Sequence, residues 1–250
     1  MAKNKNTVEI WRGPSLIDGS PIVVLLQGIT EPNTNSKIGE SMLQAWIIRS
    51  DISPAAAIAD GLDYGICGDC QHRGDKANGV ARTCYVIPRT PQSVWRSFAA
   101  GNIARVTFAQ LAPMVAGRPV RIGAYGDPAA VPVAVWRQLT RLTAGHTGYT
   151  HQWKWAGLQG VVMASADSEQ DQRDARAMGY RVFRVKAPDM PLMTGEIACP
   201  ASDEAGFKSS CERCQLCDGS TGRSDARKSI AINVHGNGTR AFIQLRQVAA

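Results

Sequence analysis

The sequence predicts an α/β fold built on a mainly parallel sheet, either open or curved into a partial barrel. Three observations support this prediction. In the second half of the chain, short apolar runs alternate with amphipathic stretches, as strands alternate with helices. Glycine- and proline-containing turns separate these segments. The helical stretches also begin at residues that favour helix starts, such as serine, and stop at glycine.

Residues 1–50 are expected to form N-terminal strands packed on the core. The runs TVEIW and PIVVLLQGI read as two strands joined by a turn at Arg12-Gly13-Pro14. A polar loop follows at residues 31–39. The next run, SMLQAWIIRSD, is a strand or a short helix, because it is too short for its periodicity to decide.

Residues 51–236 are expected to form an α/β partial barrel that carries two cysteine clusters. Helices are predicted at SPAAAIADGL, with Ser53 as N-cap, and at PQSVWRSFAAGNI, PVAVWRQLTRLTAG and SEQDQRDARAMG, the last with Ser168 as N-cap. Strands are predicted at PVRIGAY, GYTHQW, LQGVVMASAD, YRVFRVK and SIAINVHG. Residues 237–250 are expected to be a C-terminal tail or an edge strand.

The strongest chemical signal is the run CPASDEAGFKSSCERCQLC, which holds four of the seven cysteines. Thiolates are soft ligands that select zinc or iron–sulfur chemistry over magnesium or calcium. A C-x2-C-x2-C run is typical of iron–sulfur proteins, whereas structural zinc sites more often use two separated pairs. We therefore expect one centre, a 4Fe–4S cluster or alternatively zinc, at Cys199, Cys211, Cys214 and Cys217.

The first cluster contains Cys67, Cys70 and Cys84, with His72 two residues beyond the C-x2-C pair. With His72 as fourth ligand, it would be a closed structural zinc site. Without His72, three thiolates would hold an iron–sulfur cluster that keeps one iron open to a ligand. A third interpretation places Cys84 in a core strand with its neighbours, with no metal at all.

Polar side chains follow several predicted strands, at the edge where parallel strands end. The candidate acid–base residues of this edge are Asp127, His151 and Asp167. The candidate cofactor-binding residues are Tyr125, Gly126 and His235. Gly-Asp-Pro is also ordinary turn chemistry, and the aromatic bunch in GYTHQWKW is also ordinary core material. We predict that one cavity collects Asp127, His151, Asp167 and His235.

The composition limits the partners and the location. A net charge of +7 and a pI near 9.2 favour contact with a polyanion such as nucleic acid or a nucleotide. No apolar run approaches the roughly 20 residues of a membrane span. The start MAKNKNTVEIW lacks the apolar centre of a signal peptide, so we expect a cytoplasmic protein. Clustered cysteines in that reducing compartment indicate metal ligands rather than disulfides.

The chain resembles the phage gene product 88-like family. The shared features are NSKIG, the first cysteine cluster ending in CYV, VRIGAYGDP, GYTHQW, MASADS, and the second cysteine cluster before INVHG. That family resembles diverged radical S-adenosylmethionine enzymes, which implies a partial (β/α) barrel. It also implies a reactive iron–sulfur cluster at Cys67, Cys70 and Cys84, an auxiliary one at the later cysteines, and S-adenosylmethionine as co-substrate. The usual signature of radical S-adenosylmethionine enzymes is a C-x3-C-x2-C run, and this chain contains no such run.

The leading hypothesis is an iron–sulfur protein of phage or mobile-element origin, acting in the host cytoplasm on an unidentified substrate. The resemblance favours an open first cluster, so we expect His72 to point away from the cavity that holds Asp127. The alternative is a zinc-stabilised nucleic-acid-binding or replication-associated protein without catalysis. Its support is the positive charge together with Arg73, Arg82, Arg89 and the Trp153/Trp155 pair.

Overall fold

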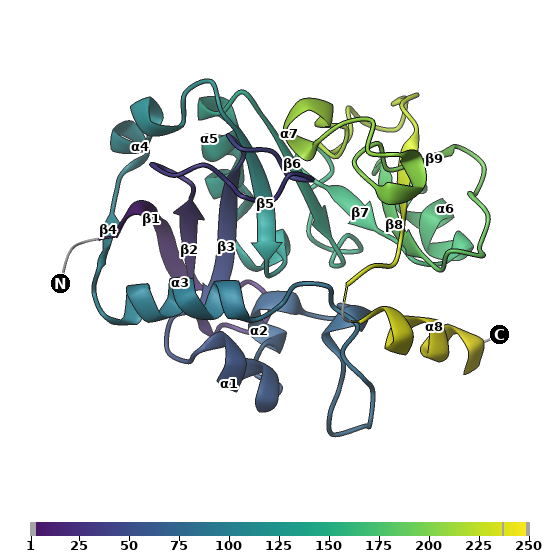
Figure 1. The fold of residues 1–250 in the computed structure, drawn as a ribbon, viewed down its shortest axis with the longest axis horizontal. Helices are drawn as coiled ribbons and strands as arrows, with labels where there is room; N and C mark the ends of the chain where they lie inside the picture. Colours follow the sequence, from purple (N-terminus) through teal and green to yellow (C-terminus); the bar gives the residue numbers. More distant parts are fainter. Residues whose placement is uncertain (1–3, 237, 249–250) are drawn as a thin grey trace.

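The computed structural model describes residues 4–236 and 238–248, which form a mixed α/β structure around one ten-stranded sheet. The strand order is β4-β1-β2-β3-β5-β6-β7-β8-β10-β9 (Figure 1). The strands are β1 (Asn4–Pro14), β2 (Pro21–Gln27), β3 (Leu43–Arg49), β4 (Ile103–Arg105), β5 (Pro119–Tyr125), β6 (Gly145–Thr150), β7 (Met163–Ser165), β8 (Val182–Lys186), β9 (Glu196–Ala198) and β10 (Ser229–Asn233).

The sheet is antiparallel only where β2 pairs with β1 and with β3. From β3 to β10 the neighbouring strands are parallel and follow the order of the chain, with β9 added beyond β10. This confirms the predicted mainly parallel α/β sheet. The N-terminal strands belong to the same sheet, because β3 pairs directly with β5.

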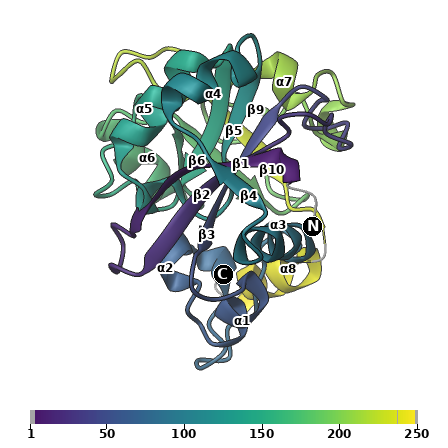
Figure 2. The ribbon, with the colours of Figure 1, turned by 90° about the vertical axis from the view of Figure 1, so that its left-hand side faces the viewer.

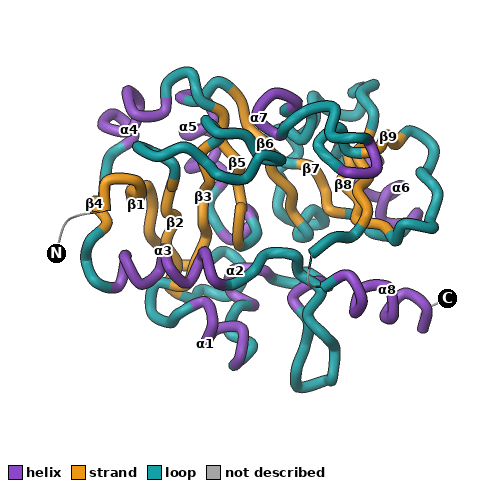
Figure 3. Tube along the Cα trace, viewed as in Figure 1, coloured by secondary structure: helices purple, strands orange, loops and turns teal. Residues whose placement is uncertain are grey.

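Helices flank the sheet (Figure 3). Figures 1 and 2 both show α1, α3 and α8 together on one side of the molecule, away from α4 and α5. The helices are α1 (Pro54–Ala59), α2 (Tyr64–Cys67), α3 (Arg89–Ala99), α4 (Phe108–Val115), α5 (Val133–Leu142), α6 (Glu169–Ala177), α7 (Cys211–Cys214) and α8 (Thr239–Val248), with short 3-10 turns η1 (Gln71–Arg73), η2 (Pro128–Ala130) and η3 (Asp203–Ala205).

Two predicted helix starts are confirmed in atomic detail. The hydroxyl of Ser53 accepts a hydrogen bond from Ala56 N at the start of α1, and Ser168 accepts one from Asp171 N at the start of α6. Both serines have extended backbone angles, which is the conformation that an N-cap requires. The four predicted helices correspond to α1, α3, α5 and α6.

SMLQAWIIRSD forms strand β3, one of the two alternatives that its sequence left open. Other expectations need correction. The predicted strand GYTHQW ends at Thr150, and the strand within LQGVVMASAD is limited to Met163–Ser165. Most of the expected tail or edge strand is helix α8, whose Phe242 packs on Ala187 and Val234. The remainder of that segment, residues 237 and 249–250, lies outside the described residues.

The apolar core is divided between the two halves of the sheet. A large cluster surrounds β2, β3 and β5 and includes the fully buried Trp136 of α5. A smaller cluster beneath β7, β8 and β10 contains Met163, Phe183 and Ile230 together with Cys199 and Cys217. Two cysteines of the second group, Cys199 and Cys217, are thus part of the core at the far end of the sheet.

Replacing Ser168 with alanine is expected to reduce the free energy of unfolding by about 1 kcal/mol, because Asp171 N loses its capping acceptor. Urea unfolding followed by circular dichroism measures the change. The matched control is Ser224→Ala at an exposed position, which is expected to change stability by less than about 0.5 kcal/mol. Equal effects of the two substitutions would contradict the capping role.

Candidate metal and substrate site at the carboxyl edge of the sheet

The predicted edge residues follow four parallel strands. Asp127 lies just beyond β5, His151 beyond β6, Asp167 beyond β7 and His235 beyond β10. A cavity of about 320 Å³ occupies this end of the sheet, and Asp127, His151 and His235 line it. Asp167 does not line this cavity, contrary to the prediction that one cavity collects all four residues. Its carboxylate lies 4.0 Å from the ring of His72, and His72 does line the cavity. The structure therefore brings all four residues to one region of the fold.

One face of the sheet supplies the floor of the cavity. Alternate residues of a strand point to the same face, and the cavity lining includes such alternating sets from three strands. These sets are Arg121, Gly123 and Tyr125 of β5, Phe183 and Val185 of β8, and Ile232 and Val234 at the end of β10.

Asp127 is buried and fastens the ends of two strands together. Its carboxylate accepts hydrogen bonds from Thr150 Oγ1 (2.6 Å), His151 N (2.7 Å) and Ala129 N (2.9 Å). Its own backbone N donates to Ile66 O in α2. Burial raises the pKa of Asp127, and the hydrogen bonds and His151 oppose that rise. The observed contacts give Asp127 a positioning role, in addition to its place in the cavity wall.

His151 connects the edge to the first cysteine cluster. Its Nε2 lies 3.7 Å from Cys70 Sγ. Burial alone would lower the pKa of His151, but the neighbouring Cys70, Asp167 and Asp127 raise it to about 10. His151 is therefore held where it can carry a positive charge beside the sulfur of Cys70.

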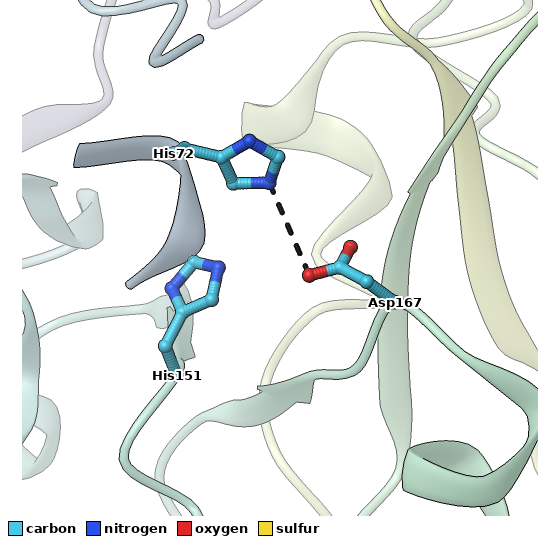
Figure 4. A group of neighbouring side chains, drawn as sticks. All are labelled: His72, His151 and Asp167. Atoms are coloured by element: carbon cyan, nitrogen blue, oxygen red, sulfur yellow. Dashed lines mark ion pairs between the residues drawn. The ribbon is translucent and has the colours of Figure 1, made fainter. Parts of the chain in front are cut away.

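His72 corrects a prediction, because it faces the cavity instead of pointing away from it. Its side chain is buried, its Nδ1 lies 2.8 Å from Thr83 Oγ1, and its ring lies edge-on to that of His151. Figure 4 shows the rings of His72 and His151 and the carboxylate of Asp167 gathered around one point. The ring also stacks on Phe242 of α8, at 5.7 Å between centroids.

The three cysteines of the first cluster all line the cavity. Cys67 ends α2, Cys70 precedes η1, and Cys84 is held by a hydrogen bond from its backbone N to His72 O. Cys84 lies outside any strand and its neighbour Tyr85 is exposed, which contradicts the core-strand interpretation. Burial raises the pKa of Cys67 and Cys84, so these thiols keep their protons unless a metal displaces them.

The second group gathers where β9, α7 and the following loop meet. Cys199, Cys211 and Cys217 pack in the same apolar cluster. Cys214 is the last residue of α7, which begins at Cys211. Burial and the neighbouring thiols raise the pKa of Cys217. Cys199 and Cys211 also line the cavity, so this cavity lies between the two cysteine groups.

The three candidate cofactor-binding residues also line the cavity. Tyr125 is buried, and within the described part of the chain its hydroxyl has no hydrogen-bond partner. His235 is exposed, with Nε2 3.2 Å from Lys37 Nζ. The backbone itself requires glycine at position 126. The φ of Gly126 is +81°, and a Cβ there would come within 2.7 Å of Ile47 O.

Sequence analysis did not identify several residues of the site. Arg121 donates to the hydroxyl of Tyr85, and both line the cavity. Gln71 donates to the carboxylate of Asp167. Lys37, from the NSKIG segment, lies at the cavity because its carbonyl accepts from Cys211 N. The alternation of Arg121 with Gly123 and Tyr125 in β5 was a usable signal, since it puts a charged residue on a functional face.

The residues that favoured nucleic-acid binding are largely engaged within the protein. Arg73 and Arg82 both donate to the buried carboxylate of Asp63. Trp153 is buried in a core cluster, whereas Trp155 is half exposed. The Trp153/Trp155 pair therefore does not form a common stacking surface.

Fold and site together define an α/β protein with a thiol-lined cavity at the carboxyl edge of its sheet. No protein-family model matches the chain, and no curated protein or solved structure is significantly similar to it. Among the helices of the described residues, none combines the length and the apolar character needed to cross a membrane.

Proposed function

We propose that this protein is an iron–sulfur enzyme with a radical S-adenosylmethionine-like partial barrel, which acts on a small molecule bound in the cavity. The observation that carries the proposal is the cavity lining, which contains Cys67, Cys70 and Cys84 of one cysteine group and Cys199 and Cys211 of the other. The proposal includes the phage or mobile-element origin and the S-adenosylmethionine co-substrate that the family resemblance implies.

The topology supports the proposal. The first cysteine group follows β3, which is the first of the parallel strands that run in chain order. Sheets wound in chain order are those of β/α barrels, and barrel enzymes hold their reactive groups in the loops beyond the strand ends. Closure of the sheet into a partial barrel is part of the proposal.

The donor set fits an iron–sulfur cluster. All seven cysteines are free, and they are divided into a group of three and a group of four. In the described chain, no three of their sulfurs lie within 4.8 Å of one another. A single zinc ion would require sulfurs about 3.8 Å apart, given Zn–S bonds of about 2.3 Å. A cluster of several irons does not require its cysteine sulfurs to lie that close, so the proposal rests on the number and softness of the thiol ligands.

The cavity walls suit a small substrate. Its volume of about 320 Å³ lies within the range of small-molecule sites. Tyr149 and Phe183 stack at 3.9 Å on one wall, and Arg82, Arg121 and Lys37 provide cationic groups. An iron–sulfur cluster bound beside this space would supply one-electron chemistry. The protein's own residues would orient the substrate.

The test is metal and sulfide analysis of protein purified without oxygen, by mass spectrometry, absorption and electron paramagnetic resonance. Wild type is expected to contain iron and sulfide. Cys70→Ala is expected to lose the iron of the first group, while His72→Ala retains it. Cys214→Ser is expected to lose the iron of the second group and to lower the melting temperature, because metal binding contributes to folding.

Two results would overturn this proposal. The first is colourless protein that contains zinc and no sulfide, which favours the zinc-stabilised alternative. The second is equal metal loss in His72→Ala and Cys70→Ala, which would indicate a closed zinc site of three cysteines and one histidine.

A further inference from the structure

One group of three side chains in the described chain has ligand atoms within 4.8 Å of one another, namely His72, His151 and Asp167. They come from separate segments: η1, the loop after β6 and the loop after β7. In Figure 4 all three point toward the same space. His72 and Asp167 are buried, and His151 is partly buried. We refer to these residues as the two-histidine group.

Each member of the two-histidine group is oriented by a second residue. Thr83 Oγ1 contacts His72 Nδ1 at 2.8 Å, which leaves Nε2 facing Asp167 at 4.0 Å. Gln71 donates to the Asp167 carboxylate. Histidine ligands of metals are usually fixed in this way through their other ring nitrogen, and ligating carboxylates are hydrogen-bonded as well.

We propose that His72, His151 and Asp167 bind a single divalent first-row metal ion, such as Mn²⁺ or Fe²⁺, in the wall of the cavity. Two imidazoles and one carboxylate form the ligand set of mononuclear sites with open positions. Metal–ligand bonds of about 2.0–2.2 Å place neighbouring ligand atoms about 3 Å apart. The ligand atoms of the three side chains therefore need to approach one another by about 1–2 Å on binding.

The proposed ion is distinct from the iron–sulfur clusters and does not depend on them. Its ligands are nitrogen and oxygen atoms, which suit Mn²⁺, whereas thiolates select softer ions. His72 and His151 line the cavity, so the open coordination positions face its contents. The consequence for function is a metal-bound water or substrate oxygen next to the thiol-lined wall.

The test uses Mn²⁺ as the probe, with free Mn²⁺ measured by electron paramagnetic resonance during titration of chelator-treated protein. Wild type is expected to bind a single Mn²⁺. Asp167→Asn and His151→Ala are expected to weaken binding more than about 100-fold, since loss of an outer partner alone costs about 10- to 100-fold. His235→Gln, which changes a cavity histidine outside the group, is the matched control and is expected to keep wild-type affinity.

Two further variants separate this site from the thiolates and from misfolding. Cys70→Ser is expected to lose iron but to keep Mn²⁺ affinity, whereas Asp167→Asn loses Mn²⁺ affinity and keeps iron. Thr83→Val preserves side-chain volume and is expected to weaken Mn²⁺ binding about 10-fold; it carries the test if Asp167→Asn does not fold. Absence of binding in folded wild type overturns the proposal. Wild-type Mn²⁺ affinity in folded Asp167→Asn or Thr83→Val also overturns the proposal. Loss of Mn²⁺ affinity in Cys70→Ser while Asp167→Asn keeps it has the same consequence.

Discussion

Replacing Glu196 with glutamine is expected to destabilise the protein by about 3–5 kcal/mol, because it leaves the buried charge of Arg184 without its partner. Both side chains are fully buried. Arg184 donates to Glu196 through Nε (2.8 Å) and Nη2 (2.6 Å). Glu196 also accepts from Gln172 Nε2 and from Met193 N. Denaturant unfolding followed by fluorescence and circular dichroism measures the loss.

The matched control removes both charges. In Arg184→Met combined with Glu196→Leu, no buried charge is left unpaired, so much of the lost stability is expected to return. The pair joins β8 to β9 across β10, and Cys199 directly follows β9. Glu196→Gln is therefore also expected to reduce iron in the second cysteine group. An equally large loss of stability in the single and the double variant would contradict the unpaired-charge explanation.

The contribution of Glu196 to stability is expected to depend on pH. Burial alone would raise the pKa of Glu196, but the hydrogen bonds from Arg184 and Met193 hold it below its ordinary value of 4.5. A carboxylate whose pKa is lowered in the folded state contributes its full stabilisation at a pH above its ordinary pKa of 4.5. This stabilisation is lost as the pH falls below 4.5. In the double variant, this part of the acid sensitivity is expected to be absent.

Replacing Asp127 with alanine is expected to cost at least about 3 kcal/mol, since three buried donors lose a charged acceptor. Those donors are Thr150 Oγ1, His151 N and Ala129 N. The free energy of unfolding from urea titration is the measurement. Thr150→Val keeps the side-chain volume and is the control; it removes one of the three hydrogen bonds to Asp127 and also the one that Gln152 N donates to Thr150 Oγ1, so it is expected to cost about 2 kcal/mol. A loss in Asp127→Ala no larger than that in Thr150→Val would show that the carboxylate does not join the two strands.

The sequence predicted the arrangement of the edge because the rule behind it is general. Hydrophobic runs identified the parallel strands, and parallel strands place their ends at one edge. Asp127, His151 and His235 consequently met at one cavity. The helix starts at Ser53 and Ser168 were also predictable, because capping depends on residues only three positions away.

The orientation of His72 was not predictable in this way. It depends on stacking against Phe242, which is far along the chain in a segment expected to be a tail or a strand. The early end of β6 likewise follows from a tertiary contact, in which Thr150 and His151 donate to Asp127. Local patterns identify elements, whereas contacts between distant segments decide where the elements end and which way their polar side chains point.

The position of β3 in the sheet has a consequence for how the chain reaches this structure. β3 pairs with β2 across the connection formed by residues 28–42, but its other partner, β5, comes only after the first cysteine loop and helices α1 to α4. Nearby antiparallel strands pair early, while parallel pairing over long separations is slow. A nascent chain therefore presents the apolar β3 with an open hydrogen-bonding edge until β5 arrives. Such an edge promotes aggregation, so slow synthesis at low temperature favours recovery of folded protein.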